Sequence, residues 1–227
     1  ASSPLTLNLL LRLQQRGGAL PTSRADIMRE ALLLICTPTT EREQRGHATE
    51  YPAEQLFEPV SALASITVLT ARPIIATDSL TAEEHSNVLQ HLGTSLAFLS
   101  AIDPSATLSI ANAAIATAIF RSHGPNNIRF AHRTYQEFLA AHWLGNSNWT
   151  LDQLQDALTV PRTDSQRCVA PQLRDTASWL AAFRSDWRIC LANSEPLLIL
   201  ESDAILSNPS LAEQITASLL AKAASGT

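Results

Sequence analysis

Between residues 107 and 144 the hydrophobic period of the sequence changes twice, and this change limits the fold more than any other feature. The stretch 107–120, TLSIANAAIATAIF, is strongly apolar and predicts a buried helix. Two short apolar pieces then flank HGPNN at 123–127, whose glycine, proline and asparagines favour a turn. The run 129–144, RFAHRTYQEFLAAHWL, has helical spacing again. The sequence therefore predicts a small β-hairpin between helices, the outline of a winged-helix unit.

The rest of the sequence predicts a mainly α protein. Alanine and leucine dominate and β-branched residues are scattered, which favours helix over sheet. Ser23, with Asp26 three residues later, is the expected N-cap of one helix. The apolar face of that helix is expected to carry Ile27, Ala31, Leu34 and Ile35. Further helices are predicted after Pro4, over 56–71 and from about residue 81 through Val88 and Leu92.

Downstream of residue 148 the sequence breaks into short helical segments separated by proline, serine and asparagine. LDQLQDALTV, VAPQLRDTASWLAAF, SDWRICLAN, EPLLILESDAIL and SLAEQITASLLAKA are the five segments. Helices of this length with apolar faces indicate a solenoid-like array. The predicted domains are a helical region over 1–106, a winged-helix-like segment over 107–148 and a helical, solenoid-like segment over 149–227.

The basic residues exclude several functions for this polypeptide. Lys222 is the only lysine among 16 basic residues, and no G-x-x-x-x-G-K-[ST] loop is present. An interior Schiff-base lysine is absent for the same reason. The net charge of −5 and the lack of a dense arginine run argue against a dedicated nucleic-acid binder. We therefore predict that the chain alone, without Walker A and B motifs, is not an ATPase and has no catalytic residues.

Cysteine usage and apolar run lengths bear on the compartment. Cys36, Cys168 and Cys190 form no C-x-x-C pair, so the sequence predicts free thiols in a reducing cytosol and no metal site. No run of about 18 apolar residues would span a membrane. The N-terminal ASSPLTLNLLLRL lacks the pattern of a signal peptide and begins without an initiator methionine. We expect a cytoplasmic piece of a longer protein.

The polar start of RFAHRTYQEFLAAHWL predicts a helix cap. Thr134 and Glu137 have the T-x-x-E spacing of a capping box, so the helix is expected to begin at Tyr135. Glu137 is then a structural residue that holds the start of the helix. His132 is expected just outside the helix, at the end of the second hairpin strand. The face buried by this helix is predicted to carry Tyr135, Phe138, Leu139 and His142.

The same stretch resembles the F-x-H-x-x-x-Q-E-F-x-A-A pattern in the winged-helix region of NACHT-type STAND nucleoside triphosphatases. These signalling ATPases include animal inflammasome receptors and bacterial antiphage proteins. Residues 2–32 are similar to the region that follows the ATPase core in this family, and residues 172–206 to the helices after its winged helix. The matching residues are Phe130, His132, Gln136, Glu137, Phe138, Ala140 and Ala141.

The resemblance implies a nucleotide-sensing role in the intact parent protein. By position, His132 would contact the β-phosphate of ADP in the closed state and Pro4 would pack near the adenine. Imidazole can donate a hydrogen bond to phosphate. The resemblance further implies an upstream ATPase domain in cis that holds ADP or ATP with Mg²⁺, a downstream sensor domain, and self-oligomerisation of the opened parent. The implied role is signalling or antiviral defence.

Two other functions fit parts of the sequence. A free-standing helical adaptor or scaffold would bind a protein partner without nucleotide. A winged-helix DNA binder would use Arg121, Arg129 and Arg133 around the wing, although in the family this region serves domain packing. The reading frame upstream of Ala1 distinguishes the ATPase region from the adaptor. A parent ATPase requires a P-loop there, whereas a free-standing adaptor would have a start codon directly before Ala1.

Overall fold

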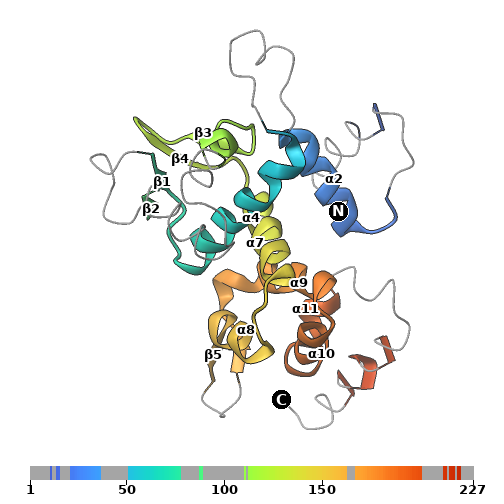
Figure 1. Cartoon of the computed structure of the whole chain (residues 1–227). Coiled ribbons are helices and arrows are strands. Elements are labelled where there is room, and N and C mark those ends of the chain that lie inside the picture. Colours follow the sequence, from blue (N-terminus) through green and yellow to red (C-terminus); the bar gives the residue numbers. More distant parts are fainter. Residues whose placement is uncertain are drawn as a thin grey trace. The chain divides into compact units, whose positions relative to one another are not determined.

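The computed structural model divides the chain into two compact units, Ala1–Ala140 and Ala141–Thr227 (Figure 1). The described residues are mainly helical and carry small β-sheets, which confirms the mainly α prediction. The predicted domain limits at 106 and 148 do not coincide with this division. The structure describes residues 21–36, 51–77, 87–88, 112–162 and 167–200, together with 11, 14, 15, 110, 212–213, 215–217 and 219–220.

Helix α2, Arg24–Cys36, begins where the sequence predicts. The Ser23 Oγ accepts the backbone N–H of Asp26 at 3.0 Å, so Ser23 satisfies one of the free donors of the first turn. The expected apolar face is partly wrong, because Ile27 and Leu34 are only half-buried. The helix buries a neighbouring set of residues instead: Ala25, Met28, Ala31, Leu32, Leu33, Ile35 and Cys36.

Helix α4, Ala53–Leu69, packs against α2 and ends before Arg72–Pro73, as predicted. Three hydroxyls on its buried side, those of Ser61, Ser65 and Thr67, donate to carbonyls of the preceding turn. At the C-terminus the Arg72 N–H bonds to the Thr67 carbonyl and the Ala71 N–H to the Val68 carbonyl. This pair of bonds is a Schellman motif, and it satisfies carbonyls that the helix leaves free.

Four short strands of the first unit form one sheet in the order β2-β1-β4-β3. β3 and β4 pair antiparallel with Phe120 opposite Phe130, which confirms the hairpin predicted around HGPNN. β1 pairs antiparallel with β4 and parallel with β2. The strands are β1, Ile75–Ala76; β2, Asn87–Val88; β3, Phe120–Ser122; and β4, Asn127–Phe130.

Two helix predictions before the hairpin are wrong at their ends. Val88, assigned to a helix, pairs with Ala76 in the sheet instead. The buried helix predicted to reach residue 120 stops at Ile115. The Thr117 Oγ1 donates to the Ala114 carbonyl at 2.7 Å and closes this end, and the chain then turns into β3. The remainder of the helix predicted from residue 81 lies outside the described residues.

Helix α7, Arg133–Asn146, follows β4 directly and contains the boundary between the two units. Its final residues belong to the second unit, in which α9, α10 and α11 pack on one another. Gly145 lies so close to Phe183 of α9 that a Cβ at this position would clash with the Phe183 side chain. The elements after α7 are α8, Leu151–Leu158; β5, Thr159–Pro161; β6, Arg167–Val169; a 3-10 turn, Pro171–Leu173; α9, Arg174–Phe183; α10, Ser185–Ser194; and α11, Pro196–Leu200.

The antiparallel hairpin β5–β6 is absent from the sequence prediction, which continues the first short helix through Thr159 and Val160. Thr150 and Gln153 form a capping box that starts α8, and the helix ends after Leu158. The β-branched residues Thr159 and Val160 then form strand β5, which ends at Pro161.

Among the described residues, no helix combines the length and apolar content that crossing a membrane requires.

Candidate functional site

His132 lies exposed between the end of β4 and the first turn of α7. Its imidazole packs edge-on against the Tyr135 ring, with centroids 4.9 Å apart. Its backbone carbonyl accepts the N–H groups of Tyr135 and Gln136 at 3.2 and 3.3 Å. The backbone of His132 is therefore engaged in starting the helix, while its side chain faces solvent.

The predicted capping box is wrong in its residues. Helix α7 begins at Arg133, so Thr134 lies inside the first turn, and His132 occupies the position before the helix. The Glu137 carboxylate accepts from the Arg133 Nε at 2.5 Å across one turn of the helix. A buried carboxylate needs a charged partner, and a cation one turn away supplies it. In the structure Glu137 is the ion-pair partner of Arg133 and does not cap the helix from Thr134.

Gln136 connects α7 to α4. Its Nε2 donates to the Thr67 Oγ1 at 2.9 Å, across 69 residues of sequence. The Thr67 hydroxyl in turn donates within its own helix, to the carbonyls of Leu63 and Ala64. Because this hydroxyl is buried, its acceptor capacity needs a partner, and among the described contacts the Gln136 amide of α7 supplies it. The glutamine of the motif thus positions the helix that follows His132.

The apolar residues of the motif are buried around the N-terminal part of α7. Phe130 ends β4 and packs on Phe120 with ring centroids 4.5 Å apart. Phe138 and Ala140 are fully buried on α7, as is Ala141 at the beginning of the second unit. His132 is therefore the exposed member of a set whose other residues pack or form internal polar contacts. Pro4, the other residue expected near nucleotide, lies outside the described residues.

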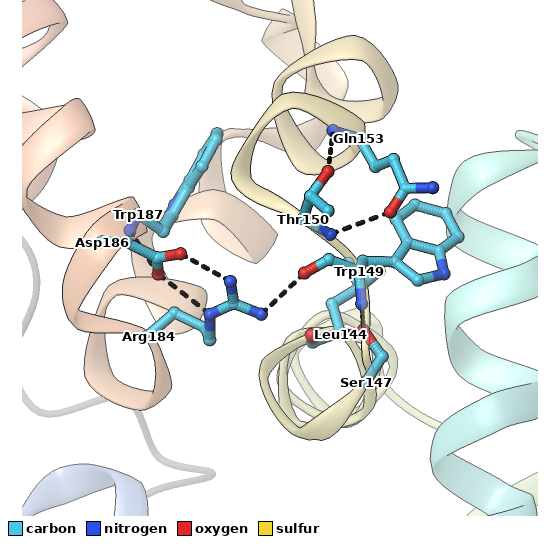
Figure 2. Close-up of polar contacts among 8 residues, drawn as sticks. All are labelled: Leu144, Ser147, Trp149, Thr150, Gln153, Arg184, Asp186 and Trp187. Carbon is cyan, nitrogen blue, oxygen red and sulfur yellow. Dashed lines mark hydrogen bonds and ion pairs between the residues drawn. The ribbon is translucent and has the colours of Figure 1, made fainter.

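In the second unit a polar network joins the α9–α10 corner to the loop before α8 (Figure 2). The Arg184 Nη1 donates to the Trp149 carbonyl at 3.1 Å, and its Nε donates to the Asp186 Oδ1 at 2.9 Å. The Trp187 N–H donates to the same carboxylate. The hydrogen bond from Arg184, with help from that N–H, lowers the pKa of Asp186 against the opposing effect of burial.

A groove of about 580 Å³ opens beside this network, between α8, the β5–β6 hairpin and α10. Trp187 forms part of its lining, and Ile189 at its side is 55% exposed. The Gln155 Nε2 donates to the Cys190 Sγ at 2.9 Å within the groove. No sequence signal indicated this groove, because it depends on a hairpin of two three-residue strands. Its remaining lining is Leu151, Thr159, Arg167, Val169, Asp186, Asn193 and Ser194.

The cysteines occur as free thiols in different surroundings. Cys36 is buried in α2, and burial, reinforced by the charge of Glu54, raises the pKa of its thiol to about 12. Cys168 and Cys190 are half-buried. Within the described ranges, no three histidine, cysteine or carboxylate side chains gather in a group suited to a metal ion.

No protein-family pattern, curated protein or solved structure matches the chain.

Proposed function

We propose that this chain is the regulatory helical and winged-helix region of a NACHT-type STAND ATPase, continuing into a solenoid-like helical array. It couples the ADP or ATP state of an upstream ATPase domain to opening and self-oligomerisation in signalling or antiviral defence. The observation that carries the proposal is the exposed His132 imidazole, which stands at the start of α7 among motif residues that are buried or internally bonded.

The packing around His132 supports a contact made to a partner outside the described residues. The Gln136–Thr67 hydrogen bond and the Arg133–Glu137 ion pair hold the first turn of α7, which sets the position of the imidazole. A rigidly held imidazole donates a directed hydrogen bond to a phosphate at a smaller loss of conformational entropy than a mobile one. Gain or loss of such a bond shifts the balance between two domain arrangements.

The proposal is tested in the intact parent protein, purified and analysed for bound nucleotide after denaturation. We expect the parent to carry an upstream P-loop and to retain ADP, and the variant His132→Ala to release ADP faster and self-associate without a stimulus. The matched control is His123→Ala, which removes a half-buried histidine from the turn of the same hairpin. We expect this control to retain ADP as the wild type does.

Two results would overturn the proposal. One is unchanged ADP retention in the His132→Ala parent, which would remove the role of this side chain. The other is a start codon directly before Ala1, which would leave no ATPase domain in cis. The purified chain of 227 residues is expected to show no ATP turnover on its own.

A helical adaptor that binds a protein partner without nucleotide is a second candidate. The groove beside Trp187 and the exposed Leu197 and Leu200 of α11 favour it, because apolar surface of this kind is typical of protein contacts. A parent that lacks both a P-loop and bound nucleotide would support the adaptor and exclude the first proposal.

A further inference from the structure

Two arginines stand directly opposite each other on the β3–β4 hairpin. The register pairs Arg121 with Arg129. Directly paired residues of antiparallel strands project to the same face, with Cβ atoms about 4.5–5.5 Å apart. Like charges in this arrangement repel and weaken the strand pair. The hairpin therefore carries two positive charges at a separation that costs it stability.

Neither charge is balanced within the part of the chain that the structure describes. Five other arginines, Arg29, Arg133, Arg167, Arg174 and Arg184, each form an ion pair with a carboxylate. Arg121 and Arg129 form none there, and the Nε of Arg129 is buried without a hydrogen-bond acceptor. An unpaired buried donor adds to the cost of the repulsion. An anion between the two guanidinium groups would relieve the repulsion.

The packing of the hairpin keeps the arginines on one face. Phe120 and Phe130, the neighbouring cross-strand pair, are buried and pack in a tilted arrangement with ring centroids 4.5 Å apart. Successive side chains of a strand point to opposite faces, so the aromatic core fixes Arg121 and Arg129 on the other one. A slip of one residue would bury both charges, so the pair is held in place by the register.

The count of charges selects the chemistry of the anion. Two guanidinium groups carry a charge of +2 and present planar forks that bind oxyanions through paired hydrogen bonds. A phosphomonoester at neutral pH carries about −1.5 to −2 and three acceptor oxygens. A carboxylate or a phosphodiester carries one negative charge and leaves a net charge of +1 at the arginine pair. We propose that Arg121 and Arg129 form a binding site for a terminal phosphate group; neither residue is part of the nucleotide contact proposed for His132.

The test uses the 227-residue chain with inorganic phosphate and AMP as probes, and with adenosine and a short DNA duplex as comparisons. Binding is measured by titration calorimetry and by the thermal unfolding midpoint at fixed ionic strength. We expect phosphate and AMP to bind and raise the midpoint, and adenosine to have no effect. Equal affinity for phosphate and AMP would assign recognition to the phosphate group alone, whereas tighter AMP binding would add a contact to the nucleoside.

The variants Arg121→Gln and Arg129→Gln are each expected to weaken phosphate binding at least tenfold. Arg121→Gln is also expected to raise the midpoint without phosphate, because it removes the repulsion, so a folding defect cannot explain its loss of binding. The control Arg29→Gln removes the same charge from an arginine in the same unit that already has a carboxylate partner, and is expected to change affinity less than twofold. Equal responses to phosphate in all variants, or binding of duplex DNA without binding of phosphate or AMP, would overturn the proposal.

Discussion

At the scale of single residues, Ala71 is a point of backbone strain. It follows the end of α4 with φ of 54°, in the left-handed region that residues with a Cβ avoid. The two Schellman hydrogen bonds at this end, to Thr67 and Val68, require that conformation. Glycine is the residue that helices favour at this position, so the alanine adds backbone strain at the end of α4.

We expect Ala71→Gly to stabilise the protein. The left-handed conformation costs a residue with a Cβ about 1–2 kcal/mol. The greater freedom of glycine in the unfolded chain offsets roughly 0.4–1 kcal/mol of that gain. A net increase of about 0.5–1 kcal/mol in the free energy of unfolding should appear in urea titrations. Ala62→Gly, inside the same helix, is the control and should destabilise by roughly 1 kcal/mol or more. A loss of stability in Ala71→Gly would contradict this account of the helix end.

Asp186 gives the second prediction at this scale, and it concerns pH. Its pKa is lowered chiefly by the hydrogen bond from Arg184. A carboxylate whose pKa is lowered by folding stabilises the protein at pH values above the ordinary pKa, which is 3.8 for this group. This stabilisation is lost as the pH falls through the lowered pKa of the folded state. Asp186→Asn should therefore be less stable than the wild type at pH 7, and the difference should shrink toward pH 3 in urea unfolding.

The control for the pH prediction is Asp175→Asn, at an exposed position in the first turn of α9. We expect it to change stability less at pH 7, because no arginine fork holds this carboxylate among the described contacts. A difference between wild type and Asp186→Asn that is the same at pH 7 and pH 3 would show that ionisation of Asp186 does not contribute. The measurement thus separates the contribution of the Asp186 charge to stability from that of the side chain's shape.

At the scale of elements, the packing of α7 on α9 depends on Gly145. A Cβ built on this residue would lie 2.5 Å from the Cβ of Phe183. Glycine inside a helix ordinarily costs about 1 kcal/mol relative to alanine. Its presence here is explained by the close approach of the two helices.

Gly145→Ala is accordingly expected to destabilise the second unit by about 1–3 kcal/mol, against the ordinary gain from helix propensity. Thermal unfolding followed by circular dichroism would measure the change. Asn146→Ala, at the next and exposed position, is the control: it removes an exposed hydrogen bond to the His142 carbonyl and should destabilise by less than about 1 kcal/mol. A stabilised Gly145→Ala protein would mean that Phe183 moves aside at little cost.

The elements also show where sequence patterns succeed. Ser23 is a correct N-cap because its hydroxyl acts on a residue three positions away. The hairpin at HGPNN is correct because glycine and asparagine determine a turn locally, and Gly124 and Asn126 both adopt positive φ. The capping box at Thr134 is wrong because the helix already begins at Arg133, where the His132 carbonyl accepts its first hydrogen bonds, and Glu137 pairs with Arg133 four residues earlier.

At the scale of the whole molecule, α7 links the two compact units within one helix. The boundary between Ala140 and Ala141 leaves residues 141–146 as the part of α7 in the second unit. A helix of this length does not persist alone in water. Gly145 nevertheless lies against Phe183, and His142 packs edge-on against the same ring, so the second unit uses this short piece in its packing.

We expect a fragment over 133–227 to be more stable than one over 141–227, because the first keeps α7 whole. Amide hydrogen exchange of α9 and α10 would report the difference as slower exchange in the longer fragment. A third fragment over 147–227, without any of α7, should be the least stable. Equal protection in all three fragments would show that α7 does not contribute to the second unit.

The sequence by itself determined the helices α2, α4 and α7, the β3–β4 hairpin and the lack of a lysine-dependent phosphate loop. Each of these depends on residues within a few positions of one another. The tertiary structure decided the strands β1, β2, β5 and β6, which are two or three residues long and too short to show a period of their own. It also decided the roles of Gln136 and Gly145, because hydrogen bonds and close packing between helices depend on partners remote in sequence. The exposure of His132 belongs to this second group, since burial is a property of the packed neighbours and not of the residue.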